Sequence, residues 1–175
     1  MRFLRRTDIE IGAPVIAWFD RECANMISKI LVPVDGSAHA SAAVNWASDL
    51  AIKYQARLLL VHVLTERGSG MIPEELREFA KMERIEITEW DILESVARQI
   101  VHAAEQRARS RGANSVETAV QVGHPAEVIL ERSKKFGADL IVMGRRGLGP
   151  LPGLLLGSVS SKVLHLADCA CLSVK

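Results

Sequence analysis

The sequence predicts a single α/β domain built on a parallel, five-stranded sheet. Short apolar runs rich in β-branched residues alternate with longer segments in which apolar residues recur every three or four positions, the pattern of successive βαβ units. The first runs are apolar almost throughout, which is typical of strands that helices cover on both faces. The 175 residues suffice for one ordinary domain, so a second domain is not expected.

The expected strands follow from these apolar runs. KILVPVD and ARLLLVHVL are the first two, SVETAVQVG alternates as the third, ADLIVMG is the fourth and CACLSVK the last. The strands are therefore expected over residues 29–35, 56–64, 115–123, 138–144 and 169–175.

Helices are expected between the strands, over residues 38–54, 74–111, 125–137 and 158–166. Ser37 is suited to cap the first of them. The long charged segment ends at Gly112, and weaker helix propensity over 85–90 allows a break there. Pro125 suits the first turn of the next helix, and Gly137 suits its end.

Composition and charge exclude several classes of protein. Hydrophobic residues make up 49% and charged residues 25%, the mixture of a globular protein. The formal net charge of +1 provides no overall attraction to nucleic acid or to an anionic membrane, so neither is expected as a partner. The longest apolar runs are far below the roughly 18 to 20 residues that cross a bilayer. Three cysteines without a CxxC pair indicate a reducing compartment, and we expect a cytoplasmic protein.

The first 26 residues lie outside the alternating pattern. Their apolar residues have no clear period, and Asp8 and Glu10 interrupt the place where a signal peptide would be apolar. Met26 is followed by a normal start for the domain. Residues 1–26 are therefore expected to be an extension of uncertain role, either a dispensable arm or an upstream misread start, and residues 27–175 the domain.

A glycine-rich stretch, GRRGLGPLPGLLLGSVSSK, joins the fourth strand to the last helix. Parallel α/β sheets bind ligands outside the carboxyl ends of their strands, where this stretch begins. Gly144 and Gly147 can adopt backbone angles closed to other residues and let a ligand approach the main chain. Gly157 and Ser158 open a helix whose first N–H groups lack acceptors, which suits a phosphate. The alternative is a mobile loop without a ligand, since neither a Walker motif nor GxGxxG is present.

Polar side chains in the same stretch are candidates for the phosphate site. Ser158 and Ser160 would add hydroxyl donors, and Arg145 and Arg146 would add positive charge unless their side chains point to solvent.

Residues 27–175 resemble the universal stress protein family. The nucleotide-binding subclass of that family has glycine, two residues, glycine, nine residues, then glycine followed by Ser or Thr, which Gly144, Gly147, Gly157 and Ser158 match. ILVPVDGS, LLLVHV, VGHPAEVIL and DLIVMG also resemble the family in order and spacing.

The resemblance implies a flavodoxin-like, three-layer fold of the adenine nucleotide alpha hydrolase-like type, with strand order 3-2-1-4-5. It implies that ATP, or the related ADP or AMP, binds over the first and fourth strands, with Mg²⁺ accompanying the nucleotide. It also implies a homodimer that pairs through the last strand, together with an unknown regulatory protein partner.

The resemblance further assigns residues to the parts of the nucleotide. Asp35 would accept a hydrogen bond from the adenine or its neighbourhood, and Pro33 and Val63 would line the base pocket. Met143 and Gly144 would lie near the ribose. The phosphates would be held, chiefly through backbone N–H groups, by Gly147, Gly157, Ser158, Val159 and Ser160.

The residues alone leave other interpretations open. Asp35 in V-D-G-S also suits a turn or a helix entry. Val63 and Met143 also suit plain core packing. His62 is more typical of a core histidine with a satisfied ring than of a metal ligand, because no partner lies at a ligand spacing.

The sequence is compatible with three functions, and it favours a nucleotide-dependent stress-response protein. No activated nucleophile and no carboxylate pair for Mg²⁺ is evident, so at most slow ATP hydrolysis or autophosphorylation of Ser158 or Ser160 is expected. An ATP-dependent ligase or adenylating enzyme would need an SGGxDS-like run after the first strand, and VPVDGS lacks those glycines. A nucleotide-free interaction module is the third.

Overall fold

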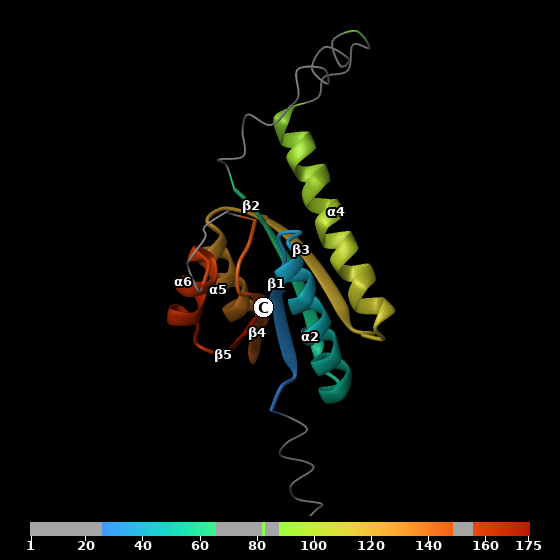
Figure 1. Ribbon diagram of the computed structural model, residues 1–175, viewed down its shortest axis with the longest axis vertical. Helices are drawn as coiled ribbons and strands as arrows, with labels where there is room; N and C mark the ends of the chain where they lie inside the picture. Colours follow the sequence, from blue (N-terminus) through green and yellow to red (C-terminus); the bar gives the residue numbers. More distant parts are fainter. Residues whose placement is uncertain (1–25, 66–81, 83–87, 149–155) are drawn as a thin grey trace, which may run out of the picture.

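A computed structural model describes residues 26–65, 82, 88–148 and 156–175 (Figure 1). Five parallel strands form one sheet in the order β3-β2-β1-β4-β5, which confirms the predicted fold class and strand order. The strands are β1 Lys29–Pro33, β2 Arg57–Leu64, β3 Val116–Val122, β4 Leu140–Gly144 and β5 Ala170–Val174. The predictions for residues 1–25 lie outside the described residues.

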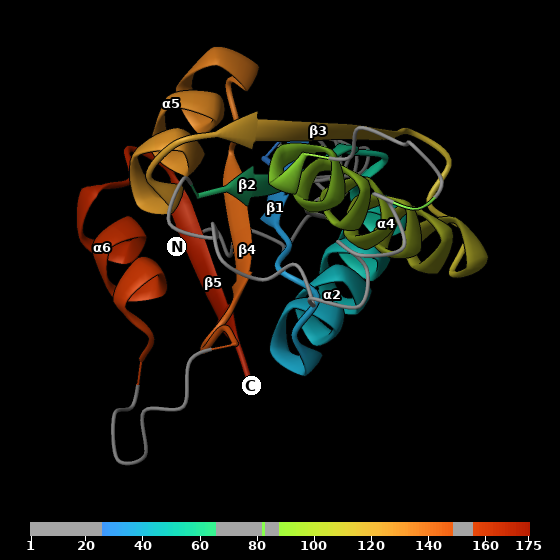
Figure 2. The same cartoon turned by 90° about the horizontal axis from the view of Figure 1, so that it is seen from above.

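Helices cover both faces of this sheet (Figure 2). Helices α2 and α4 lie on one face, where they enclose a core that includes Ile30, Leu58 and Val101. Helices α5 and α6 lie on the other face, over Leu31 and Val61. The helices are α2 Ala38–Tyr54, α4 Glu89–Ser110, α5 Pro125–Phe136 and α6 Ser158–Leu166. The three predicted layers are therefore present.

The helix ends follow capping signals in the sequence. Ser37 Oγ accepts a hydrogen bond from Ala40 N at 3.1 Å, as predicted for the start of α2. Gly137 has φ +66° after α5, as suits a helix end. Thr88 and Asp91 form a reciprocal capping box, so α4 begins at Glu89 and the predicted helical stretch is interrupted where the sequence allows a break. Of residues 74–87, only Met82 is described.

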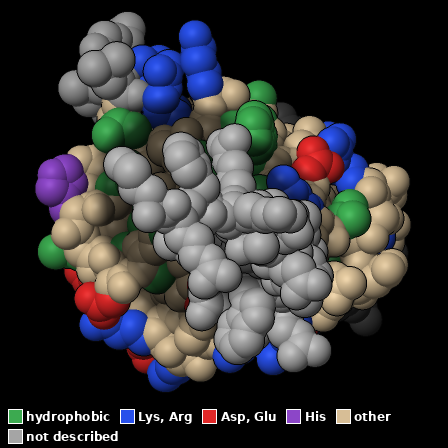
Figure 3. Space-filling model, turned by 90° about the horizontal axis from the view of Figure 1, so that it is seen from below, with side chains coloured by type: hydrophobic (Ala, Val, Ile, Leu, Met, Phe, Trp, Pro, Cys, Tyr) green, Lys and Arg blue, Asp and Glu red, His purple; other side chains and the backbone are tan. Residues whose placement is uncertain are grey.

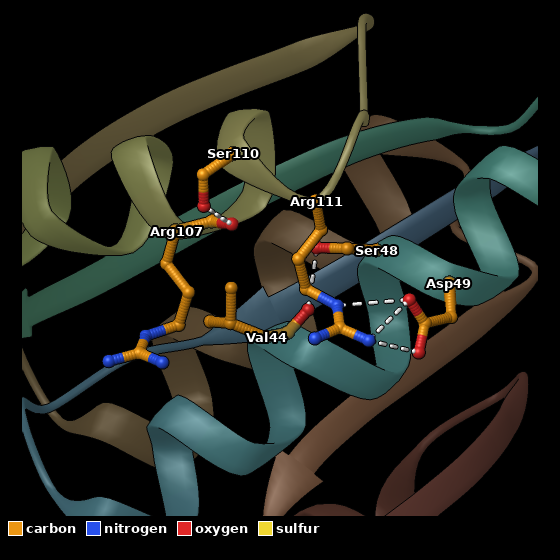
Figure 4. A network of polar contacts seen from close by, with 6 residues as sticks. All are labelled: Val44, Ser48, Asp49, Arg107, Ser110 and Arg111. Carbon is orange, nitrogen blue, oxygen red and sulfur yellow. Dashed lines mark hydrogen bonds and ion pairs between the residues drawn. The ribbon is translucent and has the colours of Figure 1, made fainter.

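An ion pair joins the two helices on one face of the sheet. Arg111, directly after α4, donates from Nη2 to both carboxylate oxygens of Asp49 on α2, at 2.8 and 2.7 Å (Figure 4). On α2, the buried Ser48 hydroxyl donates to the Val44 carbonyl one turn earlier, at 2.7 Å. Arg111 Nε also donates to Asp49 Oδ1 at 3.0 Å, so a fork-shaped contact on the surface links the end of α4 to α2.

The sheet has its switch point between β1 and β4. The chain runs from β1 outward to β2 and β3, and then returns to the far side of β1 for β4 and β5. The ladder between β1 and β4 contains only the pairs Ile30↔Leu140 and Leu31↔Ile141. Pro33 is the next residue that would donate toward β4, and it has no N–H. The two strands therefore lack further pairing at their carboxyl ends.

The opposite end of β1 is tied to β4 through Asp139. Its Oδ2 accepts hydrogen bonds from Ser28 N at 2.8 Å, Ser28 Oγ at 2.8 Å and Lys29 N at 2.9 Å. Burial alone would raise the pKa of Asp139, but the hydrogen bonds from Ser28 and Lys29 and the charge of Lys29 together hold it below its ordinary value. The carboxylate thus sets where β1 begins beside β4.

The described surface carries basic and acidic side chains close together. In the face shown in Figure 3, blue and red side chains neighbour one another along the margin of the described residues. Elsewhere among the described residues, opposite charges also form ion pairs between helices, such as Lys162 of α6 with Glu127 of α5 at 2.9 Å. Among the described residues, no helix is both long and apolar enough to cross a membrane.

We predict that Asp139→Asn destabilises the protein by about 1 kcal/mol at pH 7, because amide oxygen is a weaker acceptor than carboxylate for the Ser28 and Lys29 donors. The folded-state pKa of Asp139 is depressed, so its contribution is present above the ordinary carboxyl pKa of 3.8 and is lost as the pH falls through the folded value. Urea unfolding of both proteins at pH 7 and pH 3 measures this. An equal difference at both pH values would contradict the assignment.

Candidate functional site

A cleft of about 290 Å³ lies at the carboxyl ends of the central strands, beside the start of α6. All ten site residues that the sequence predicts line this one cleft. They are Pro33, Asp35, Val63, Met143, Gly144, Gly147, Gly157, Ser158, Val159 and Ser160. The structure therefore brings together residues that are as much as 127 positions apart in the chain.

One wall of the cleft is apolar. It includes Val61 and Met143, which are buried in the core between the sheet and α5, and Ile129 from α5 itself. Pro33 and Val63 add partly buried side chains from the ends of β1 and β2. The alternative interpretation of Val63 and Met143 as core residues is correct as well, because this wall is also the edge of the core.

Asp35 joins the turn after β1 to the glycine-rich loop. Its Oδ1 accepts from Ser37 N at 2.9 Å, the local turn that the alternative interpretation predicts. Its Oδ2 faces Gly147, where an added Cβ would lie only 2.5 Å from this oxygen. Asp35 is thus a turn residue whose second oxygen remains at the cleft.

Gly144 packs closely against the first turn of α2. A Cβ at this position would lie 2.8 Å from the backbone carbon of His39 and 2.9 Å from Ala40 N. One of the two reasons expected for Gly144 and Gly147, unusual backbone angles, is wrong, because neither has a positive φ and close packing is what leaves no room for a side chain. The described glycines with positive φ are others, namely Gly36, Gly112, Gly123 and Gly137.

The start of α6 presents backbone donors to the cleft. Gly157 is the N-cap and provides no side-chain cap, and its own N–H donates to the Arg145 carbonyl at 2.9 Å. The first intrahelical bond runs from Ser161 N to Gly157 O at 2.9 Å. The N–H groups of the first three helical residues precede that bond and have no acceptor within the helix. All three residues, Ser158, Val159 and Ser160, line the cleft.

The two serine hydroxyls differ. Ser160 is buried, and its Oγ lies 2.9 Å from the Arg145 carbonyl and 3.0 Å from the Gly157 carbonyl. Its single hydroxyl proton is therefore used by the backbone, which corrects the expectation of a free hydroxyl donor there. Ser158 is exposed, so its hydroxyl remains accessible.

The ends of β1 and β2 separate at Val34. Val34, directly after β1, donates from its N–H to Val61 O at 2.8 Å. This is the last backbone hydrogen bond between this segment and β2. The Val34 carbonyl would next accept from Val63 N, but no such bond forms among the described residues. His62 Nδ1 lies 2.7 Å from that carbonyl instead. The ring thus has a hydrogen-bond partner, as predicted, but His62 is half-buried at the cleft and does not lie within the core.

Arg146, which the sequence offers as a source of positive charge, also lines the cleft. Several further lining residues are not among the predicted site residues, namely Val34, Ala40, Val61, His62, Pro125, Ile129, Leu148 and Leu156. Ile129 belongs to the apolar face of its helix. This pattern predicts that its side chain faces the sheet, but it does not predict that it reaches the cleft. Asp35 is the single acidic residue among the lining residues, and the described residues contain no group of three or more His, Cys, Asp or Glu that could hold a metal ion.

The family sequence model described as "Universal stress protein family" matches residues 26–175, which contain every lining residue of the cleft. The chain belongs to the universal stress protein family. A curated member, universal stress protein YxiE of Bacillus subtilis, is 35% identical over 162 residues, which cover 86% of this chain and all of that protein.

Solved structures of the family share the fold. Universal stress protein UspA from Lactobacillus plantarum has a TM-score of 0.68 and 26% identity, covering 85% of this chain and 98% of that one. A universal stress protein crystallised in complex with cAMP has a TM-score of 0.59 and 26% identity, covering 85% of this chain and 96% of that one.

We predict that Gly147→Ala destabilises the protein by about 1 to 3 kcal/mol, because the new Cβ would overlap the Asp35 carboxylate. In an Asp35→Ala background the same change should cost much less, since the overlapping oxygen is gone. Urea unfolding of the four proteins measures the coupling. Gly157→Ala is the matched control, because its added Cβ has no neighbour nearer than 3.4 Å and its cost should be the same in both backgrounds. Additive costs at Gly147 would contradict the contact.

Proposed function

We propose that the cleft binds ATP or a related adenine nucleotide and that the bound nucleotide controls the conformation or partner choice of this universal stress protein. The observation that carries the proposal is the start of α6, where three backbone N–H groups without helical acceptors line the same cleft as an apolar wall. A nucleotide has the complementary parts, an anionic phosphate chain and a flat base.

The phosphates belong at the α6 end of the cleft. The N–H groups of Ser158, Val159 and Ser160 supply hydrogen-bond donors, and the partial positive charge of the helix N-terminus favours an anion. Gly157 exposes the main chain beside them. Asp35 is a carboxylate and would repel phosphate, so it suits the base or the ribose, as the family resemblance assigns it.

The base belongs against the ends of β1 and β2. Pro33 and Val63 would contact its face, and the Val63 N–H points to where β1 no longer supplies an acceptor. Adenine offers an unprotonated N1 that would accept from this N–H. Met143 and Gly144 then lie between the base and phosphate ends, where the ribose would be.

The family comparison supports an adenine nucleotide in general. The relative crystallised with cAMP carries an adenine base and a ribose phosphate in a protein of the same family. We further propose that the nucleotide carries three phosphates. The three backbone donors at the start of α6 favour ATP over ADP or AMP. Mg²⁺ would accompany the phosphates and neutralise part of their charge.

Binding is favoured over turnover. Ser37 Oγ already accepts from Ala40 N, so the start of α2 is capped by its own side chain and does not present the free phosphate loop of an adenylating enzyme. Slow hydrolysis or autophosphorylation would fall on the exposed Ser158, because the Ser160 hydroxyl is buried and bonded to two carbonyls.

The proposal includes a cytoplasmic homodimer paired through β5. Arg145 N donates to Val174 O, so the backbone groups of Val174 and Leu172 face β4. Those of Cys171 and Ser173 face the other way, toward the outer edge of the sheet, where a second copy of β5 would pair. Cys169 and Cys171 are free thiols, as suits a reducing compartment. The regulatory partner that would respond to the nucleotide is a further part of the proposal.

ATP at a hundred times its dissociation constant should stabilise the protein by about 2.7 kcal/mol, and Gly157→Val should abolish that stabilisation. The valine side chain would occupy the space beside the α6 donors. Thermal unfolding with and without ATP, together with mass spectrometry of any nucleotide that copurifies, measures this.

The matched control is Ala38→Val, which places the same side chain at the exposed first position of α2, outside the cleft. This variant should retain the full response to ATP. A wild-type protein that neither copurifies with a nucleotide nor responds to millimolar ATP would refute the proposed function and leave the interaction module as the better reading.

Ser173→Pro should convert the proposed dimer to a monomer, because proline removes an N–H that faces the outer edge of β5 and leaves the pairing with β4 intact. Sedimentation velocity over a range of concentrations measures the change. The variant should still respond to ATP, which separates dimer loss from unfolding. If the wild type is a dimer and Ser173→Pro has the same sedimentation coefficient, the interface lies elsewhere than at β5.

A further inference from the structure

His62 occupies an unusual place at the end of β2. It lies one residue before Val63 and lines the cleft, while its Nδ1 is 2.7 Å from the Val34 carbonyl. A carbonyl oxygen can only accept, so Nδ1 carries the proton of this hydrogen bond. The ring thereby spans the gap between the end of β1 and the end of β2.

This bond falls where the strand ladder would otherwise continue. Arg57 N donates to Ser28 O and Val34 N donates to Val61 O, so odd residues of β2 face β1. In that alternation the Val34 carbonyl is the natural acceptor for Val63 N. The bond is absent, and the imidazole donor stands in its place.

We propose that His62 is a positioning residue that holds the Val34 carbonyl away from Val63 and so keeps the Val63 N–H available to a base with an unprotonated N1. The inference rests on the proposed function and deepens it, because it names what selects the base. Adenine presents an acceptor at N1, whereas hypoxanthine and guanine carry a hydrogen there. A free donor at Val63 therefore favours adenine over the other two purines.

Two variants separate the hydrogen bond from the bulk of the ring. His62→Leu removes the donor, whereas His62→Asn keeps an N–H donor close to the position of Nδ1. In the absence of nucleotide, amide hydrogen exchange at Val63 should slow at least tenfold in the leucine variant, because its N–H then bonds to Val34 O. The asparagine variant should keep the exchange rate of the wild type.

Binding provides the second readout. The wild type should bind ATP more tightly than inosine triphosphate by about tenfold, the value of one hydrogen bond of this kind. His62→Leu should reduce that ratio toward one and His62→Asn should retain it. Affinity for inorganic tripolyphosphate, which has no base, should be the same in all three proteins and shows that each variant is folded.

The outcomes are distinguishable. A wild type that binds no adenine nucleotide refutes the proposed function, while the exchange measurement at Val63 still decides whether His62 holds the Val34 carbonyl. Unchanged exchange and an unchanged ATP to inosine triphosphate ratio in His62→Leu overturn the role of His62. Equal loss of the ratio in both variants overturns it too, because the ring's bulk and not its donor would then be responsible.

Discussion

The early end of β1 is the constraint on which the cleft depends. Pro33 has no N–H to donate to β4, and one residue later Val34 makes the last backbone bond to Val61. The chain then turns at Gly36, with φ +82°, into α2. A longer β1 would have filled the space beside Val63 with its own backbone. The space stays open because β1 stops pairing with both of its neighbours, β4 and β2, at Pro33 and Val34, whereas β2 continues to Leu64.

The three glycines of the family motif have different physical tasks. Gly144 lets the backbone at the start of α2 approach β4, and Gly147 makes room for the Asp35 carboxylate. Both are packing positions that the fold requires whether or not a ligand is bound. Gly157 alone stands at the helix start that offers free N–H groups. The spacing of the motif therefore reflects how α2, the Asp35 turn and α6 are assembled, and the physical case for a nucleotide depends on the last glycine and the donors that follow it.

The sequence predicts the elements well and their ends less well. Helical periodicity and caps such as Ser37 locate the helices, but the sequence predicts a first strand through residue 35, whereas β1 ends at Pro33. The strand order came from the family resemblance, because periodicity alone carries no information on which strands are neighbours. The ten site residues meet in one cleft, yet the task of each depends on contacts between distant segments. The Ser160 hydroxyl bonds to the carbonyl of Arg145, and the His62 ring bonds to that of Val34, and no local pattern predicts either bond.

The position of α6 connects the cleft to the edge of the sheet. This helix has nine residues and no side-chain cap at its start, so little within it stabilises its first turn. Phosphate oxygens, as proposed, would accept from those first N–H groups and stabilise that turn. The other end of α6 leads through residues 167–169 to β5, whose outer edge is the proposed dimer contact. The nucleotide and the second subunit would then act on opposite ends of one short segment, and the binding of either would be expected to strengthen the binding of the other, because both stabilise the same helix and strand.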